Sequence, residues 1–172
     1  MLSFATKSLA NTITLINILL GSLAIIYIIN QHYNIAAILI IIAVFMDGLD
    51  GKVARKFQIT SDLGKQLDSL CDLVSFGVAP AILIYAKVFN QHSLEILGIV
   101  FTLLFVMCGA FRLARFNTLN IPDHFIGIPI TFAGFIIAAI SFAFVELPFI
   151  VSIILLFILS YLMISNIRVP KW

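Results

Sequence analysis

The segment DGLDGKVARKFQITSDLGKQLDSLCD, residues 47–72, lies between two strongly apolar parts of the chain. Asp47 and Asp50 lie at its start, next to the preceding apolar run, and Asp68 and Asp72 lie at its end, next to the following one. These four aspartates are half of the eight acidic residues. A carboxylate at the centre of a membrane helix costs about 2.5–3.5 kcal/mol, and neighbouring carboxylates also repel one another. The segment therefore indicates a functional site that holds cations.

The chain outside this segment has the composition of a membrane protein. Hydrophobic residues make up 62% of its 172 residues and charged residues 10%, whereas soluble domains have about 25% charged residues. A membrane-spanning helix needs about 20 apolar residues. The candidate spans are Asn11–Ile29, Ile35–Arg55, Leu63–Phe89, Leu94–Arg115, Gly127–Val145 and Phe149–Ser165. Because the loops are short, we expect an all-α integral membrane protein, a bundle of six transmembrane helices forming a single domain over residues 1–172.

Basic residues predict the orientation of this bundle. Nine of the ten Lys and Arg residues fall on one side of the spans, and only Lys87 falls on the other. Since Lys and Arg are enriched in cytoplasmic loops, both termini and the acidic segment should face the cytoplasm, with the protein in the cell membrane. There is no long basic run that would bind a polyanion, so we expect no nucleic-acid partner.

Helical spacing places the aspartates on one side of each of two helices. Asp47 and Asp50 share a side of the second span, and Asp68 and Asp72, four residues apart, can contact one ion together. Carboxylates without His or Cys suit Mg²⁺, Mn²⁺ or Ca²⁺ rather than Zn²⁺. Four carboxylates could hold two such ions, an arrangement that clamps the attacking and leaving oxygens in phosphoryl transfer.

Small and basic residues accompany the aspartates. Gly51, Ala54 and Gly64 would let a bulky ligand approach the backbone, although small residues also serve close helix packing. Arg55 and Lys65 could contact phosphate groups, or they could be ordinary cytoplasmic-side cations. Neither alternative is decided by these residues alone.

The pattern Asp47-x2-Asp50-Gly51-x2-Ala54-Arg55-x8-Gly64-x3-Asp68-x3-Asp72 resembles the complete signature of the CDP-alcohol phosphatidyltransferase family. All eight specified residues are present over 26 positions. The resemblance implies a membrane enzyme, usually a homodimer. Such an enzyme transfers a phosphatidyl group from a CDP-linked lipid to an alcohol and releases CMP.

The resemblance also implies roles for individual residues. The four aspartates would bind two divalent cations, Mg²⁺ or Mn²⁺, and Asp72 would in addition be the general base. Asn11-x2-Thr14-x2-Asn17, in the first span, is similar to a family element that helps to bind the nucleotide. With Lys65 added for its charge, the expected CDP-binding residues are Asn11, Thr14, Asn17, Gly51, Ala54, Arg55, Gly64 and Lys65.

Further segments resemble the branch of the family that uses L-serine as the acceptor: SLCDLVSFGVAP at 69–80, GAFRLARFN at 109–117, FIGIP at 125–129 and ISNIRVP at 164–170. This resemblance implies CDP-diacylglycerol and L-serine as substrates and phosphatidylserine as the product, in contact with membrane lipids.

The serine carboxylate needs a cationic partner, and planar guanidinium groups suit it. Each arginine could instead be an anchor that reaches for lipid headgroups. The candidate acceptor-binding residues are Arg112 and Arg115, followed by Asn117 and Arg168.

Two other interpretations stay open. A sibling enzyme with glycerol 3-phosphate or inositol as acceptor would carry the same signature, and three arginines could serve a phosphorylated acceptor. A cation transporter would also place carboxylates in a membrane. A transporter should, however, have polar residues through the whole bilayer, whereas the outer halves of these spans are apolar and no inverted repeat is evident.

Overall fold

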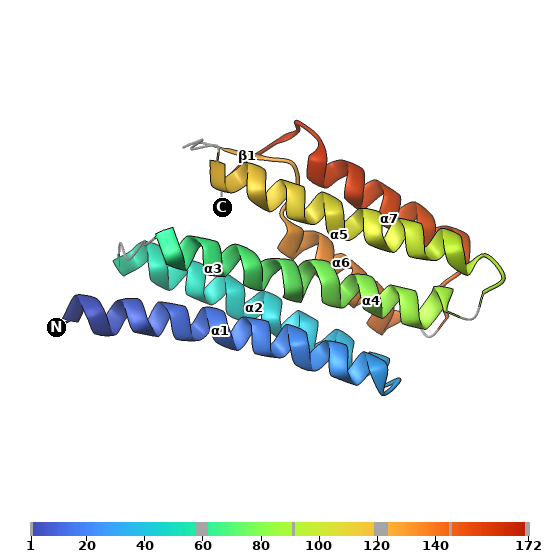
Figure 1. Ribbon diagram of the computed structural model, residues 1–172, viewed down its shortest axis with the longest axis horizontal. Helices are drawn as coiled ribbons and strands as arrows, with labels where there is room; N and C mark the ends of the chain where they lie inside the picture. Colours follow the sequence, from blue (N-terminus) through green and yellow to red (C-terminus); the bar gives the residue numbers. More distant parts are fainter. Residues whose placement is uncertain (1, 58–61, 91, 119–123, 145, 171–172) are drawn as a thin grey trace.

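The computed structural model is an elongated bundle of helical rods (Figure 1). It describes residues 2–57, 62–90, 92–118, 124–144 and 146–170. Only the backbone is described for residues 2–11, 13, 50–57, 62, 124–126 and 168–170. Six rods make up this part of the chain, and each overlaps one of the predicted spans, so the all-helical prediction is confirmed.

The rods differ in construction. The third is continuous but changes helix type along its length, and a short antiparallel strand pair joins the connection between the fourth and fifth rods to the segment after the sixth rod. The elements are α1 (Leu2–Ile29), α2 (Tyr33–Phe57), α3 (Asp62–Asp72), the π-helical η1 (Leu73–Val78), α4 (Ala79–Ile84), the π-helical η2 (Tyr85–Phe89), α5 (Glu95–Thr118), β1 (His124–Ile126), α6 (Ile130–Ala143), α7 (Phe149–Ile164) and β2 (Arg168–Pro170).

The rods carry the apolar surface of a membrane protein. Two of them, Leu63–Phe89 and Glu95–Thr118, are long and apolar enough to cross a bilayer, while the apolar parts of the others are shorter. Large apolar side chains such as Leu19, Phe45 and Ile96 are exposed along the rods. Water-soluble monomers rarely expose such surface continuously, so these side chains are suited to lipid.

The π-helical segment η1 has a cause in the sequence. Pro80 lies at the start of α4 and has no N–H to donate to the backbone one turn earlier, where its ring also crowds the carbonyl. A wider turn before the proline accommodates both effects. Wide turns of this kind are rare and often occur at functional sites, and η1 begins immediately after Asp72.

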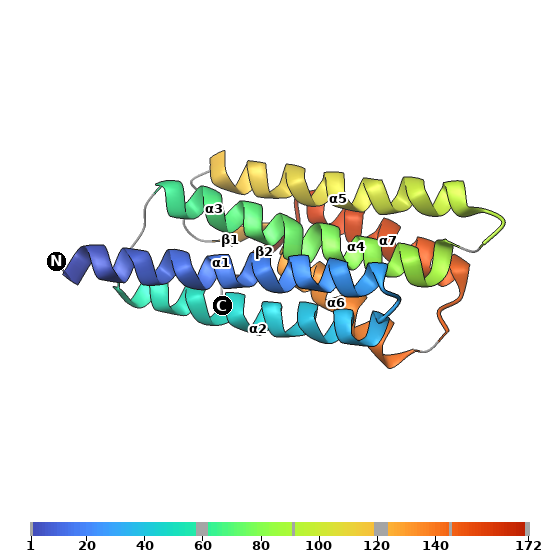
Figure 2. The same cartoon turned by 60° about the horizontal axis from the view of Figure 1, so that its bottom comes forward.

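Other helices approach the backbone of η1 very closely, because glycines face it. A Cβ atom added at Gly21 of α1 would lie 2.7 Å from the Cα atom of Ser75, and one at Gly134 of α6 would lie 2.6 Å from the carbonyl oxygen of Phe76. Small residues allow such packing in membranes, where tight contact replaces the hydrophobic effect. Figure 2 shows α1 and α6 running alongside the third rod.

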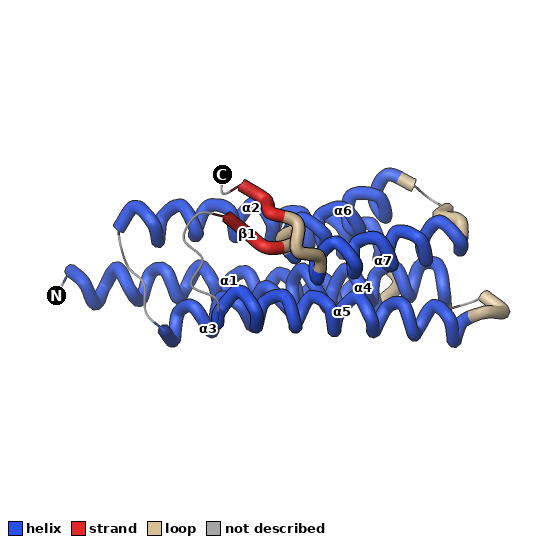
Figure 3. The backbone as a smooth tube through the Cα atoms, turned by 90° about the horizontal axis from the view of Figure 1, so that it is seen from above, coloured by secondary structure: helices blue, strands red, loops and turns tan. Residues whose placement is uncertain are grey.

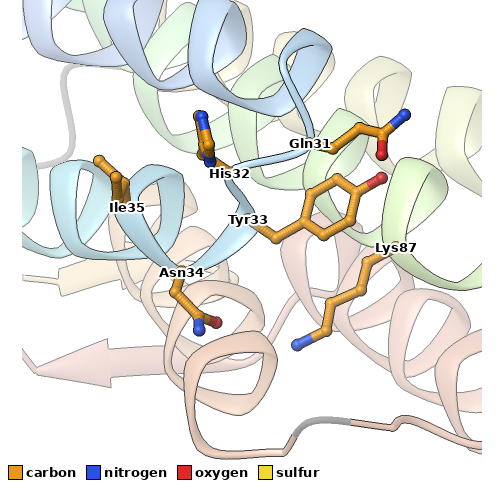
Figure 4. Close-up of a pocket in the computed structure, with 6 residues that line it drawn as sticks. All are labelled: Gln31, His32, Tyr33, Asn34, Ile35 and Lys87. Carbon is orange, nitrogen blue, oxygen red and sulfur yellow. The ribbon is translucent and has the colours of Figure 1, made fainter.

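At the end of the bundle opposite the N-terminus, α1 turns into α2 (Figures 2 and 4). A pocket of about 320 Å³ opens there, lined by Gln31, His32, Tyr33, Asn34, Ile35 and Lys87. Lys87 donates hydrogen bonds to the carbonyls of Ser141 and, at 2.7 Å, Phe144, at the C-terminal end of α6. A cation is favourable at this end of a helix, so Lys87 completes α6.

The strand pair and Gly127 tie the start of α6 to the end of α7. Strands β1 and β2 pair antiparallel, with Phe125 opposite Val169, and lie beside the helices in the half of the molecule that contains the N-terminus (Figure 3). Gly127 has φ +74° and its N–H donates to the carbonyl of Ile167 at 2.9 Å. A Cβ atom there would overlap the carbonyl oxygen of Met163. No feature of the sequence indicated these two short strands.

Substitution of Gly127 by Ala should destabilise the protein by about 2 kcal/mol or more, because a side chain is strained at positive φ and collides with backbone. Thermal unfolding in detergent, followed by circular dichroism, measures the loss. Gly48→Ala is the matched control, since no atom lies within 4 Å of the added Cβ and the site is helical. Equal unfolding temperatures for the two variants would contradict this account.

Candidate functional site

Three of the four predicted aspartates meet between α2 and the C-terminal half of α3. A carboxylate oxygen from each of Asp47, Asp68 and Asp72 lies within 4.8 Å of the others. Asp47 also hydrogen-bonds through its side chain to Asp72 and to Thr131, near the start of α6. Carboxylates this close repel one another unless a proton or a cation lies between them.

The donor set fits a divalent cation. Two oxygens bound to one ion are at most about 4.2 Å apart for Mg²⁺ and about 5.2 Å apart for Ca²⁺. The three carboxylates lie within the larger separation, would draw slightly closer around Mg²⁺, and bring only oxygen, the donor that hard cations prefer. The backbone of Asp50 continues α2 one turn beyond Asp47, but its side chain lies outside the described residues.

The predicted nucleotide element on α1 reaches the third rod. Asn17 is 1% exposed, and its backbone carbonyl accepts a hydrogen bond of 3.0 Å from Ser75 Oγ. Among the described residues, neither its side-chain nitrogen nor its side-chain oxygen has a hydrogen-bond partner. A buried amide without partners is costly, so this side chain is suited to a polar ligand. Thr14, one turn earlier, is also buried.

The other expected CDP-binding residues are described to different extents. Gly64 and Lys65 lie on α3, and Lys65 Nζ donates to the backbone carbonyl of Asn117 at 3.3 Å. The remaining expected residues lie on described backbone, but their side chains do not, so their contacts stay a prediction. They are Asn11, Gly51, Ala54 and Arg55.

The two arginines of α5, three residues apart, have different surroundings. Arg112 is 6% exposed and interacts electrostatically with Asp72, and its buried Nε has no hydrogen-bond partner in the described part of the chain. Arg115 donates to the carbonyls of Ile164 at 3.1 Å and Ser165 at 3.3 Å, at the end of α7. Arg112 thus faces the acidic cluster, and Arg115 closes the last turn of α7.

Asn117 and Arg168 were the remaining acceptor candidates. The side-chain nitrogen of Asn117 donates to Ser69 Oγ at 2.9 Å and is 3.4 Å from Gln66 Oε1, so it bridges α5 and α3. The backbone of Arg168 lies in β2, and its side chain is not among the described ones. Of these four candidates, Arg112 is the one whose described interactions include an aspartate of the cluster.

Sequence reasoning missed several contacts of the site, including Thr131 on Asp47 and Ser75 on Asn17. A hydroxyl residue at the start of an apolar span was the available signal for Thr131. Nothing in the sequence indicated the partner of Ser75. Both contacts join segments more than 50 residues apart, so they depend on how the rods pack.

Residues 7–165 match the model of the CDP-alcohol phosphatidyltransferase family. The chain belongs to this family. Membership confirms the resemblance of the eight-residue pattern, and with the apolar rods it makes the protein a membrane protein.

Curated relatives cover most of the chain. The CDP-diacylglycerol–serine O-phosphatidyltransferase of Bacillus subtilis (strain 168) is 40% identical over 166 residues, 93% of this chain and 88% of the relative. The protein of the same name from Methanocaldococcus jannaschii is 38% identical, over 96% of this chain and 75% of the relative. The archaetidylserine synthase of Methanothermobacter thermautotrophicus is 38% identical, over 95% and 70%.

The different surroundings of the two arginines predict different effects on stability. Arg115→Met should destabilise this phosphatidyltransferase by about 1–3 kcal/mol, because the carbonyls at the end of α7 lose charged donors. Arg112→Met removes the same charge from the same helix, but among the described contacts it breaks no hydrogen bond, so its cost should be smaller. Thermal unfolding of both variants in one detergent compares them, and the reverse order would refute the assignment.

Proposed function

We propose that this chain transfers the phosphatidyl group of CDP-diacylglycerol to the hydroxyl group of L-serine, giving phosphatidylserine and CMP. The observation that carries the proposal is the carboxylate cluster of Asp47, Asp68 and Asp72 facing the buried Arg112, in a chain whose relatives are named for this reaction. The cluster suits the donor pyrophosphate through bound cations, and the arginine suits the carboxylate of an amino-acid acceptor.

The proposed setting is the cell membrane. The six rods and the one-sided distribution of Lys and Arg support six crossings by one domain, with both termini in the cytoplasm. The acyl chains of the donor would stay in the bilayer while its nucleotide reaches the cytoplasmic end. A homodimer is proposed from family membership alone.

The proposed metal ligands are Asp47, Asp50, Asp68 and Asp72, for two Mg²⁺ or Mn²⁺ ions. When bound, these ions would neutralise the pyrophosphate and the charge that develops on the leaving CMP. Thr131 would orient Asp47 by its hydrogen bond. Orientation of this kind commonly decides metal affinity, because a carboxylate held in place loses little freedom on binding.

Asp72 is the proposed general base. It accepts the proton of the serine hydroxyl, the serine oxygen forms a bond to the β-phosphorus, and the bond from that phosphorus to the CMP oxygen breaks. A base must lie about 2.6–3.2 Å from the donor of its proton. The place of Asp72 in the carboxylate cluster and its electrostatic interaction with Arg112 support this role.

Asn17 is the best-supported residue for binding the CDP part of the donor. Its side chain is buried, and its amide has both a donor and an acceptor to offer. Ser75 fixes the backbone beneath it. Thr14, Gly64 and Lys65 complete the set whose side chains the structure describes, together with the proposed Asn11, Gly51, Ala54 and Arg55.

The surroundings of the arginines favour serine over a phosphorylated acceptor. Arg115 donates to the end of α7, so among the described side chains Arg112 is the guanidinium that faces the aspartates. One guanidinium matches the single charge of a carboxylate. A phosphate monoester carries nearly two charges and would call for more cations.

Release of CMP by the purified protein tests this function. CDP-diacylglycerol and a divalent metal would be supplied with L-serine, glycerol 3-phosphate or inositol in parallel. Release with serine alone, abolished by a chelator, is expected. Release with another acceptor would retain the family and reject serine. No release with any acceptor, by folded and metal-loaded protein, would favour cation transport instead.

Arg112→Met should raise KM for serine at least about tenfold and leave KM for CDP-diacylglycerol nearly unchanged, since a lost carboxylate pair of about 1.4 kcal/mol or more corresponds to that factor. Initial rates over a range of serine concentrations measure it. Arg115→Met is the matched comparison and should raise KM for serine less. A larger effect at Arg115 would assign the acceptor carboxylate to that residue.

A further inference from the structure

We propose that Asn117 is a positioning residue for the metal site, holding α3 at the rotation that turns Asp68 and Asp72 towards Asp47. The proposal rests on the proposed function in one respect, that these aspartates bind a divalent cation. It assigns to the end of α5 a part in metal binding that acts through Ser69 on α3.

Hydrogen bonds join α3 and α5 in both directions. The side-chain amide of Asn117 donates to Ser69 Oγ at 2.9 Å, and Lys65 Nζ donates back to the carbonyl of Asn117 at 3.3 Å. Ser69 Oγ in turn donates to the carbonyl of Lys65 at 3.2 Å. The hydroxyl of Ser69 therefore donates its hydrogen bond within α3 and accepts one from Asn117, which fixes the direction of the contact.

The position of Ser69 on α3 makes this contact a control of rotation. Successive helical residues are about 100° apart, so Asp68 and Asp72 are separated by about 40°, and Ser69 lies about 100° from Asp68. Because Ser69 lies beside Asp68 and Asp72 on the surface of α3, its hydrogen bond to Asn117 resists rotation of α3 about its axis. Without it, the two carboxylates can swing together away from Asp47, which lies on another helix.

The neighbouring Phe116 contacts two positively charged side chains, Lys65 of α3 and Arg112 of α5. Its ring centroid lies 5.9 Å from Lys65 Nζ and 5.9 Å from the guanidinium carbon of Arg112. Both distances are within the range of cation–π attraction. The last turn of α5 thus joins the helix of the aspartates to the proposed acceptor residue. Figure 2 shows α3 lying along α5 at this end of the bundle.

Direct binding of Mn²⁺ to the full-length protein, without lipid or acceptor, tests the proposal. Asn117→Ala should weaken binding by about tenfold, the lower end of the loss seen when residues that orient metal ligands are removed. Thr118→Ala is the matched control, because the hydroxyl of Thr118 donates to the carbonyls of Ala114 and Arg115 on its own helix. Its Mn²⁺ affinity should equal that of the wild type, with every protein measured well below its unfolding temperature.

A second variant keeps the test independent of Asn117 itself. Ser69→Ala should weaken Mn²⁺ binding to a similar extent, and the double variant should be no weaker than either single variant, because both remove one contact. Additive losses, or an Asn117→Ala protein with wild-type affinity, would overturn the positioning role. Asp68→Asn separates this failure from that of the metal site. If it too bound Mn²⁺ normally, the metal site would be refuted, and the positioning role with it.

Discussion

Repulsion among carboxylates within an apolar bundle is the constraint on which the rest of this structure depends. Asp47, Asp68 and Asp72 come from two helices and converge within one ion's reach. Such a cluster needs a balancing charge and rigid supports. The supports are hydrogen bonds from neighbouring rods, among them Thr131 to Asp47 and Asn117 to Ser69. The bundle is therefore organised around holding like charges together.

Buried groups without partners show where function overrides stability. Within the described residues, the amide of Asn17 and the Nε of Arg112 are buried without hydrogen bonds. Each is costly in an apolar setting. Arg112 interacts with Asp72 of the acidic cluster, and the backbone of Asn17 contacts Ser75, three residues beyond Asp72. By contrast, Lys87 and Arg115 have helix-end carbonyls as acceptors. These four side chains thus divide into two that complete helices and two that are proposed to bind substrate.

The sequence was most informative where helical spacing alone decides proximity. The i, i+4 pair Asp68 and Asp72 and the six apolar runs are of this kind, and the structure brings out both. The sequence did not distinguish the role of Arg112 from that of Arg115. The two residues are three positions apart on one helix, and the position of α7 decides which of them contacts its carbonyls. The strand pair β1 and β2 was missed, since three-residue strands carry no periodicity. The side chains of residues 50–57, and with them half of the signature, stay predicted.

The wide turn η1 has a consequence for how sequences of this kind can change length. It adds one residue to a helical turn directly after Asp72, and its own residues Ser75 and Phe76 pack against glycines of α1 and α6. Because the wide turn takes up the extra residue, deleting one residue there would give a regular helix and leave the segments on either side in nearly the same rotational phase. A one-residue deletion elsewhere in the third rod would instead rotate one end by about 100° against the other, so η1 is the place in this rod where a change of length disturbs the aspartates least.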